Sequence, residues 1–259
     1  ITVAVGLNPT AEDPVYRLQT IREIETLEAF ERMLAEPQQW IGGFDLPFGQ
    51  PRTLIEHEGW PTQWDTFVDF FCRQSREHLR NTFRKWCDGR PPGNKFAWRK
   101  TDKQSGSSPA MRWTNPPVAW MMHAGIQRML NAGLAFPAHR YPRKRTHIKR
   151  IALEAYPGFT ARKITRDSYK SDSPAKQTRE RQDRRELILD ALSAGQAGLA
   201  IRLEADRQWR KRIIADARGD FLDAVICSLQ AGHAALQRNF GLPRTLDTLE
   251  GWIASVPVR

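Results

Sequence analysis

Two short apolar runs in this chain each end in a single acidic residue, and proline and glycine follow shortly after. In "WIGGFDLPFGQP" the acid is Asp45, and in "IALEAYPGF" it is Glu154. Short apolar runs closed by turn residues are typical of buried strands. Because ligands of open α/β sheets bind at the carboxyl edge of the strands, the pattern predicts two strands that present carboxylates there. Taken singly, each acid is equally well explained as a cap or an ion-pair partner for the segment that follows.

The chain as a whole alternates strand-like and helix-like segments. Residues 1–7 are apolar and β-branched, as in a strand buried on both faces, and residues 15–24 alternate apolar with polar side chains. The turn residues between them predict a hairpin. "TLEAFERMLAEP" has apolar residues at helical spacing and ends in proline, which predicts a helix before "WIGGFD". The expected order is strand, strand, helix, strand, which indicates an α/β fold.

A long interruption, about residues 47–150, separates the two acid-bearing strands. It contains an aromatic-rich helical stretch over 60–86, a loop over 87–117 and a helix over 118–131. Long loops without periodicity are usually functional or disordered. Trp98 and Trp113 lie in this loop among arginines and lysines, a mixture that suits stacked bases and phosphates. Aromatic side chains that pin the loop to the core explain them as well.

The chain is strongly basic, which bears on its partner. Among 259 residues, 40 Lys and Arg stand against 29 Asp and Glu, for a net charge of +11. This excess favours a polyanion, most often nucleic acid (DNA or RNA), although solubility alone can also explain it. The segment "HRYPRKRTHIKR" (139–150) fits a phosphate-contacting rim or an ordinary solvated linker.

The cysteines and the hydropathy pattern indicate the compartment. Three cysteines without paired spacing predict neither a disulfide framework nor a structural zinc site, so the cytoplasm is the expected location. No run approaches the roughly 18 apolar residues of a membrane span. We therefore expect no membrane partner.

A third source of carboxylates is "GDFLDAVICSLQAG" (219–232), whose apolar residues form one helical stripe. Asp220 and Asp223 lie three residues apart in the first turn. Asp223 lies at the edge of the stripe and is better placed to reach the sheet. Asp220 points farther out, and as an acid at a helix start it is also explained by capping.

Asp45, Glu154 and Asp223 together form a constellation of carboxylates, with Asp220 as a further candidate ligand. No His or Cys accompanies them at zinc-ligand spacing, and oxygen ligands select Mg²⁺ or Mn²⁺. Two such ions about 4 Å apart activate water and stabilise the leaving oxygen in phosphodiester hydrolysis. Paired carboxylates also serve glycoside hydrolysis, but the basic character of the chain disfavours a neutral sugar.

Several stretches resemble motifs of the domain-of-unknown-function 429 family, predicted nucleases of the ribonuclease H-like superfamily. They are "GGFDLPFGQP", "KFAWRKTD", "GSSPAMRWTNPPVAW", "LEAYPG", "SYKS" and "GDFLDAVICSLQA", which occur in this order between residue 1 and about residue 240. The resemblance implies one ribonuclease H-like domain over residues 1–259, with the interruption as an insertion between the fourth and fifth strands. Its expected mixed sheet has a three-stranded antiparallel meander followed by two parallel strands, and its expected chemistry is two-metal hydrolysis.

The resemblance also concerns residues outside the carboxylate set. Arg99 and Asp102 in "RKTD" and Lys170 in "SYK" match family motifs, which implies contacts to the scissile phosphate. On residue type alone, all three are more simply solvated loop charges.

One departure from the family pattern concerns the first strand. The family carries an aspartate there, in a Gly-Ile-Asp-Phe type of motif, whereas residues 1–7 contain no acid and fit the second strand. We expect the first strand to lie upstream of Ile1 and to be absent from this chain. The site would then have three acids rather than four.

Three functions are consistent with these sequence features. The first is a metal-dependent nuclease, and the second is a catalytically inactive nucleic-acid-binding module on the same fold. The third, a phosphotransferase, is weak because "GLNPTAED" is not a glycine-rich phosphate loop.

Overall fold

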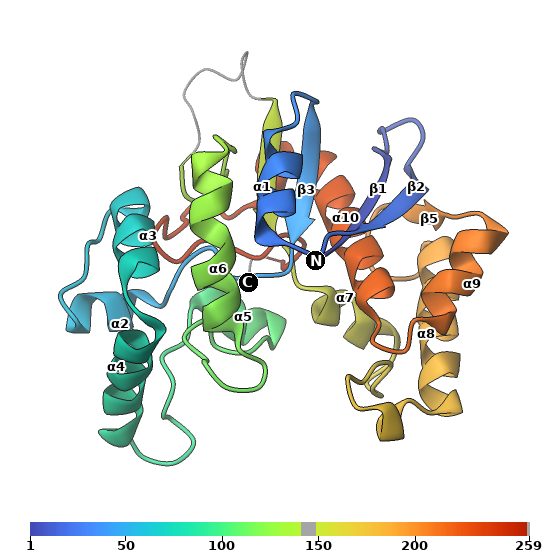
Figure 1. Cartoon of the computed structure of the whole chain (residues 1–259). Helices are drawn as coiled ribbons and strands as arrows, with labels where there is room; N and C mark the ends of the chain where they lie inside the picture. Colours follow the sequence, from blue (N-terminus) through green and yellow to red (C-terminus); the bar gives the residue numbers. More distant parts are fainter. Residues whose placement is uncertain (141–148, 258–259) are drawn as a thin grey trace.

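Five strands in the described part of the chain form two separate sheets with helices packed around them (Figure 1). The computed structural model describes residues 1–140 and 149–257. One sheet has the strand order β1-β2-β5, and the other consists of β3 and β4. The strands are β1 (Thr2–Leu7), β2 (Val15–Glu23), β3 (Trp40–Phe44), β4 (Arg150–Glu154) and β5 (Arg202–Glu204).

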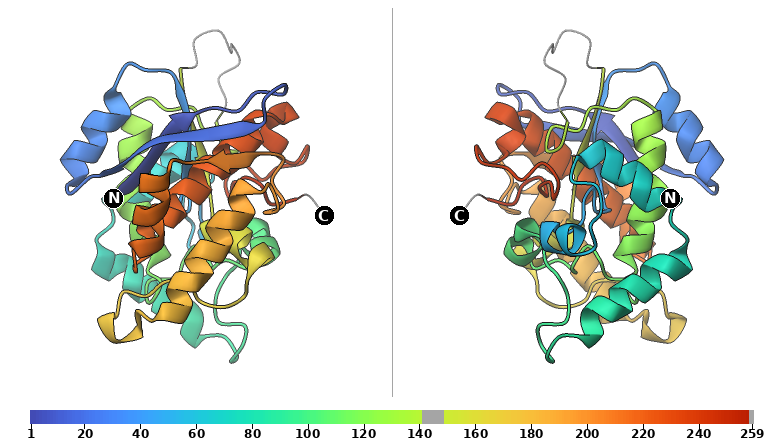
Figure 2. Two further views of the ribbon diagram at one scale, coloured as in Figure 1. Left: turned by 90° about the vertical axis from the view of Figure 1, so that its right-hand side faces the viewer. Right: turned by 90° about the vertical axis from the view of Figure 1, so that its left-hand side faces the viewer.

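Along the chain the helices fall into two groups, those before β4 and those after it, and the two views of Figure 2 show the molecule from the right-hand and left-hand sides of Figure 1. The first group is α1 (Leu27–Ala35), α2 (Arg52–His57), α3 (Trp64–Arg73), α4 (Arg76–Asp88), α5 (Lys100–Ser105) and α6 (Val118–Asn131). The second is α7 (Pro157–Ile164), α8 (Arg179–Ser193), α9 (Arg207–Ala215) and α10 (Asp220–Ala235). Short 3-10 turns occur at Pro174–Lys176 and Arg238–Gly241. None of these described helices is long and apolar enough to cross a membrane.

The expected hairpin is confirmed, and so is the pairing of the two acid-bearing strands. β1 and β2 are antiparallel, and β5 joins β2 in parallel, so this sheet is mixed. The sequence analysis missed β5 because three residues are too few to show a period. β3 and β4 are parallel with Phe44 opposite Glu154, which places Asp45 and Glu154 at the same edge. The α/β class with a mixed sheet and flanking helices is therefore present.

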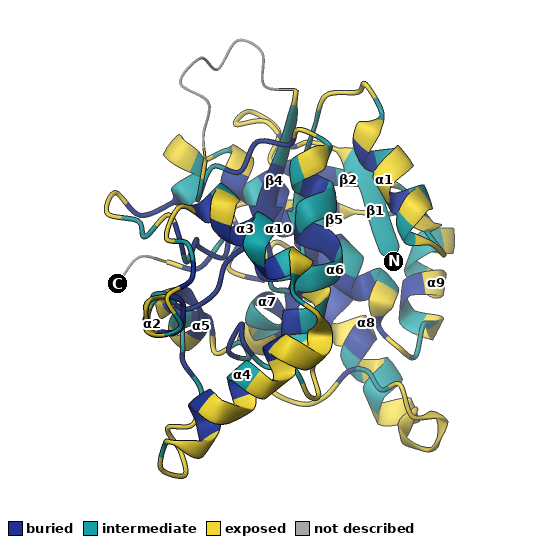
Figure 3. Ribbon diagram, turned by 60° about the vertical axis from the view of Figure 1, so that its left-hand side comes forward, coloured by how far each residue is buried: buried dark blue, intermediate teal, exposed yellow. Residues whose placement is uncertain are grey.

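The described strands do not form one continuous sheet, because β1 pairs only with β2 and β3 pairs only with β4. One expectation about the strands is wrong: β1 is not buried on both faces. Its residues are half-buried (Figure 3), and Leu7 is exposed. The physical reason is that β1 lines a cavity on the side away from β2.

The insertion between β3 and β4 builds its own apolar core. The helical stretch expected over 60–86 is two helices, α3 and α4, which Phe67, Phe71 and Phe83 anchor in a cluster shared with α6. The helix expected over 118–131 is confirmed as α6. The loop expected over 87–117 contains the short helix α5. Most of the basic segment 139–150 lies outside the described residues.

A second core joins β2 and β5 to α8, α9 and α10. The segment "KQTRERQDRRELILDAL" (176–192) predicts a basic helix with Leu187, Leu189 and Leu192 toward the core, and with Arg179, Arg181, Arg184 and Arg185 on a phosphate-facing strip or a charged outer face. This helix is α8, and Leu189 and Leu192 are buried as expected. Leu187, also expected in the core, is exposed. Arg185, expected on a charged outer face, is only 3% exposed, and it donates hydrogen bonds to the carbonyl oxygens of Tyr169 and Ile214. Arg185 therefore connects α8 to the segment that carries Tyr169 and Lys170.

Helix α10 packs against both sheets and is the element they share. At Gly43 of β3 the contact is so close that a Cβ atom would lie 2.3 Å from the carbonyl oxygen of Cys227. On β1, the Ser228 hydroxyl donates to the carbonyl oxygen of Ala4 at 3.0 Å. The two half-sheets are therefore held side by side through one helix.

The close approach at Gly43 gives a stability prediction. Gly43→Ala should destabilise the protein by about 1–3 kcal/mol, because α10 must shift away from β3 to admit the methyl group. Gly42→Ala is the matched control, since its Cβ would meet only side-chain atoms of Phe44 and Trp40, at 3.1 and 3.3 Å. Urea denaturation of the three proteins measures the difference. Equal losses for the two variants would contradict this explanation.

Candidate carboxylate site

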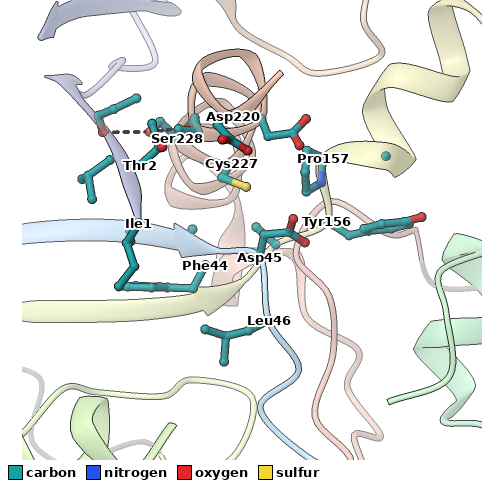
Figure 4. Close-up of a pocket in the computed structure, with 18 of the residues that line it drawn as sticks. Ile1, Thr2, Phe44, Asp45, Leu46, Tyr156, Pro157, Asp220, Cys227 and Ser228 are labelled. Atoms are coloured by element: carbon teal, nitrogen blue, oxygen red, sulfur yellow. Dashed lines mark hydrogen bonds between the residues drawn. The ribbon is translucent and has the colours of Figure 1, made fainter. Parts of the chain in front are cut away.

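A cavity of about 1490 Å³ opens between β1 and β3, with α10 on one side. Figure 4 shows Asp45, Asp220 and Cys227 around it, together with Ile1 and Thr2 of the first strand. All the expected catalytic and metal-binding residues line this cavity: Asp45, Glu154, Asp220 and Asp223. The structure thus brings together side chains that are up to 178 positions apart in the sequence (45 to 223).

Asp45 follows β3 directly, and its side chain is open to the cavity. The surrounding protein removes much of its hydration, which raises the pKa of Asp45 to about 7 from its usual 3.8. The negative charge of Asp223 raises this pKa further, while Lys170 opposes the shift. Loss of hydration is therefore the main cause of the raised pKa of Asp45, and the charge of Lys170 offsets it only in part.

Asp223 lies in the first turn of α10, is 8% exposed and has two partners. The Tyr169 hydroxyl donates to one carboxylate oxygen at 2.6 Å, and the Lys170 ammonium forms a very short ion pair with the other. Burial alone would lower the pKa of Lys170, but Asp223 raises it above its usual value. The ammonium also acts on Asp45, so Lys170 is a cation shared by two carboxylates.

Asp220, three residues earlier on the same helix, is exposed at the cavity. Partial burial raises the pKa of Asp220, and Asp216 adds to the shift. Unlike Asp223, it has no tight ion pair among the described residues. Asp220 and Asp45 are thus the more accessible carboxylates of the set.

Glu154 is buried and fully engaged. Arg99 donates to both of its carboxylate oxygens, at 2.6 and 2.8 Å, and the Phe48 amide donates at 3.0 Å. In this arrangement Glu154 is not free to act as the expected metal ligand, because the guanidinium of Arg99 already binds both of its oxygens. Its negative charge still contributes to the raised pKa of Asp45.

Arg99 and Asp102 form a structural network with Glu154 rather than a free phosphate-binding pair. Arg99 is 1% exposed, and its remaining donors go to both oxygens of Asp102 and to the carbonyl of Glu250. All five guanidinium N–H groups are satisfied, and Asp102 and Glu154 hold the pKa of Arg99 above its usual value against the effect of burial. As placed, neither Arg99 nor Asp102 has a group free for substrate.

The two tryptophans expected to stack on bases do not line the cavity in the described structure. Trp113 is half-buried, and its ring packs on Phe83 and Phe96 with centroid distances of 5.9 and 6.0 Å. Trp113 therefore anchors the loop to the core, which is the second of the two explanations that the sequence allows for it. Trp98 is half-buried as well, in the turn before α5.

Two residues of the site were missed by sequence reasoning. Tyr169 orients Asp223, and it could have been found because it sits beside Lys170 in "SYK". Cys227 lies one turn after Asp223 and faces the same cavity, where burial and the nearby carboxylates raise the pKa of its thiol well above the usual value. The sequence did not reveal that Cys227 faces the cavity, because this residue lies in a helical stripe of apolar residues.

The residues present fit a hard divalent cation only in part. Asp45, Asp220 and Asp223 offer oxygen ligands on one cavity, and a cation would offset both the lost hydration and the repulsion from Asp223 that raise the pKa of Asp45. Within residues 1–140 and 149–257, no group of three His, Cys, Asp or Glu side chains is already arranged to hold a metal. Lys170 instead neutralises the carboxylates.

Comparison with protein-family models, curated proteins and solved structures found no match for this chain. The resemblance to the domain-of-unknown-function 429 family therefore rests on the quoted motifs and stays a hypothesis. The chemistry of the site is interpreted from its own geometry.

The buried Arg99 network gives a second stability prediction. Arg99→Met should destabilise the protein by about 3–5 kcal/mol, because two buried carboxylates lose their counter-charge. Arg52→Met is the control, since the pair of Arg52 with Asp247 is partly exposed and is expected to contribute about 1 kcal/mol or less. Urea denaturation provides the comparison.

A further substitution keeps the test informative if the first variant folds poorly. Adding Glu154→Gln to Arg99→Met should recover part of the lost stability, since one uncompensated charge is removed. No recovery would indicate that Arg99 acts mainly through packing.

The raised pKa of Asp45 predicts a pH-dependent effect of Asp45→Asn. The folded protein holds this proton up to about pH 7, whereas the unfolded chain releases it near 3.8, so ionisation lowers stability as the pH rises between these values. Relative to the parent, Asp45→Asn should therefore be more stable at pH 8 than at pH 5. Urea denaturation with EDTA present measures this, and Asp88→Asn on α4 controls for the loss of one charge. A stability difference independent of pH would contradict the raised pKa.

Proposed function

We propose that this protein is a Mg²⁺- or Mn²⁺-dependent nuclease that hydrolyses phosphodiester bonds of DNA or RNA. One observation carries the proposal: the end of β3 and the first turn of α10 present Asp45, Asp220 and Asp223 to a single cavity. The net charge of +11 supports a polyanionic substrate, because it attracts phosphates at long range.

Asp45, Asp220 and Asp223 are the residues that would hold the ions. Bound there, the ions would supply an activated water and would neutralise the departing oxygen. The chain itself orients the carboxylates: Tyr169 fixes Asp223 by its hydrogen bond. The Lys170 ammonium has donors beyond the one that pairs with Asp223, and its side chain is 42% exposed, so it can also bind a phosphate oxygen.

The proposal includes a ribonuclease H-like sheet. The mixed hairpin sheet and the parallel β3–β4 pair support it, since a strand between β1 and β3 would join them in the expected order. A cytoplasmic location is part of the same proposal, and the free thiols of Cys72, Cys87 and Cys227 support it.

A catalytically inactive nucleic-acid-binding module is the second candidate. The observation that favours it is the engagement of the site's own carboxylates: Glu154 is bound by Arg99, and Asp223 by Tyr169 and Lys170. In this case the basic surface binds phosphates and the acids hold the fold together.

Asp45→Asn separates the two candidates. For a nuclease, it should reduce metal-dependent cleavage of DNA or RNA by 100-fold or more (~10²), as expected when one charge-stabilising group is lost. Folding, followed by circular dichroism, should be unchanged. Asp88→Asn, an exposed change outside the cavity, is the matched control and should cleave like the parent protein.

The reactions are run with Mg²⁺ or Mn²⁺, and again with EDTA, on single- and double-stranded DNA and RNA. Absence of metal-dependent cleavage across this panel would overturn the nuclease proposal. Nucleic-acid affinity that falls steeply with salt but does not change in Asp45→Asn would then support the binding module.

A further inference from the structure

Helix α4 of the insertion carries a row of exposed arginines that the carboxylate site does not involve. Arg76, Arg80 and Arg84 stand four residues apart, and all three are exposed. Because residues four apart lie on neighbouring turns of one helix face, their side chains form a single row along α4. None of the described residues that line the cavity belongs to α4. This arginine row is therefore a surface separate from the carboxylate site.

The rest of the insertion fixes the direction in which the arginine row points. Leu79, Phe83 and Trp86 of the same helix are at most 5% exposed and pack in the apolar core of the insertion. The guanidinium of Arg76 lies over the ring of Trp120, 5.7 Å from its centroid. Figure 3 shows the other side of α4 as exposed surface. The helix is thus a firm support, and the row is open to solvent.

The arginine row has no neutralising acid in the described structure. Three other arginines on the helices each form an ion pair with an acid four residues away: Arg52 with Glu56, Arg73 with Asp69, and Arg179 with Asp183. At Arg80 both of these positions hold arginine instead. Glu77 and Asp88 lie on the same helix, but within the described residues neither forms an ion pair with the row.

This arrangement works against the stability of the helix. Like charges four residues apart repel each other and weaken a helix, whereas opposite charges at this spacing support it. Places where a sequence breaks such a local rule are often functional sites. An anion that contacts two neighbouring arginines removes their repulsion. The arginine row therefore favours a partner that carries several negative charges in a line.

The length of the arginine row matches the phosphate backbone of a nucleic acid. From Arg76 to Arg84 the helix rises about 12 Å, at about 1.5 Å per residue. One strand of a duplex carries a phosphate about every 3.4 Å of its axis, so about three or four phosphates lie over this length. A guanidinium also donates two parallel hydrogen bonds to a phosphate group. Each arginine of the row can therefore take one phosphate.

An anionic membrane surface is the other extended partner that attracts arginines. A helix that lies in a membrane interface needs a free apolar face to insert among the lipids. On α4 this face is already buried, because Leu79, Phe83 and Trp86 pack in the core of the insertion. Phosphate contacts need only the charged side. The observations therefore favour a nucleic acid over a membrane.

We propose that the arginine row of α4 binds the phosphate backbone of a nucleic acid, outside the carboxylate cavity. Contacts to phosphates position a nucleic acid without reading its sequence, so this binding is independent of sequence. The insertion thereby provides a docking face of its own. The inference goes beyond the proposed function, since it applies equally to a nuclease and to a binding module.

The double substitution Arg80→Gln with Arg84→Gln tests the proposal. The probe is a labelled DNA duplex of about 20 base pairs, and fluorescence anisotropy follows its binding in EDTA from about 50 to 200 mM salt. The plot of log affinity against log salt concentration should become shallower by about 2, one for each lost phosphate contact. The affinity at the lowest salt concentration should fall about tenfold.

The matched control is Arg73→Gln with Arg179→Gln. It lowers the net charge by the same amount, but both arginines are exposed and already paired, with Asp69 and Asp183. Its salt dependence should stay close to that of the parent protein. Arg80→Lys with Arg84→Lys keeps the charge of the row and should retain most of the salt dependence. All three variants should keep the melting temperature of the parent, because the changed side chains are exposed.

Several results would overturn the proposal. One is a salt dependence that does not change in Arg80→Gln with Arg84→Gln. Another is an equal loss in the matched control, which would show that the net charge rather than the row attracts DNA. The third is absence of duplex binding by the parent protein, and binding to vesicles of anionic lipid would then assign the row to a membrane surface. Because EDTA removes divalent cations, none of these results depends on whether the proposed nuclease is active.

Discussion

The buried guanidinium of Arg99 is the interaction on which the rest of the site depends. It joins three separate parts of the chain: the insertion through Asp102, strand β4 through Glu154, and the C-terminal segment through the carbonyl of Glu250. With all five donors satisfied, the network holds the end of β4 in one position. Because β3 pairs with β4 in register, this position also determines where Asp45 enters the cavity.

Charge balance explains how so many acids can share one cavity. Arg99 compensates Asp102 and Glu154, and Lys170 compensates Asp223, whereas Asp45 has no ion pair among the described residues, and its lost hydration raises its pKa. The chain thus separates its carboxylates into a buried group that supports the fold and an accessible group that includes Asp220. The proposed metal site combines this accessible group with Asp223, whose carboxylate is held by Tyr169 and Lys170.

Local sequence patterns were sufficient to predict most helices and strands. They could not predict features that depend on contacts between residues far apart in the sequence. The hairpin, α6, α10 and the two acid-bearing strands follow from periodicity and turn residues. The convergence of Asp45 and Asp223 could also be predicted, since strand ends and helix starts meet at one edge. The engagement of Glu154 by Arg99 could not, because these residues are 55 positions apart and residue type does not reveal burial. The break between β1 and β3 likewise depends on which strands pair, and no local pattern encodes this.

The ion pair between Lys170 and Asp223 has a consequence for how a divalent cation would be received. An ammonium held by the chain acts as a built-in counter-ion, so the acids are tolerated without any bound ion. Folding would then not require a cation, unlike in small domains that collapse only around their metal. A cation bound at the proposed site would compete with the Lys170 ammonium for Asp223, which would lower the apparent affinity of the cation. The same lysine that balances Asp223 would thereby set the cation concentration that the proposed activity requires.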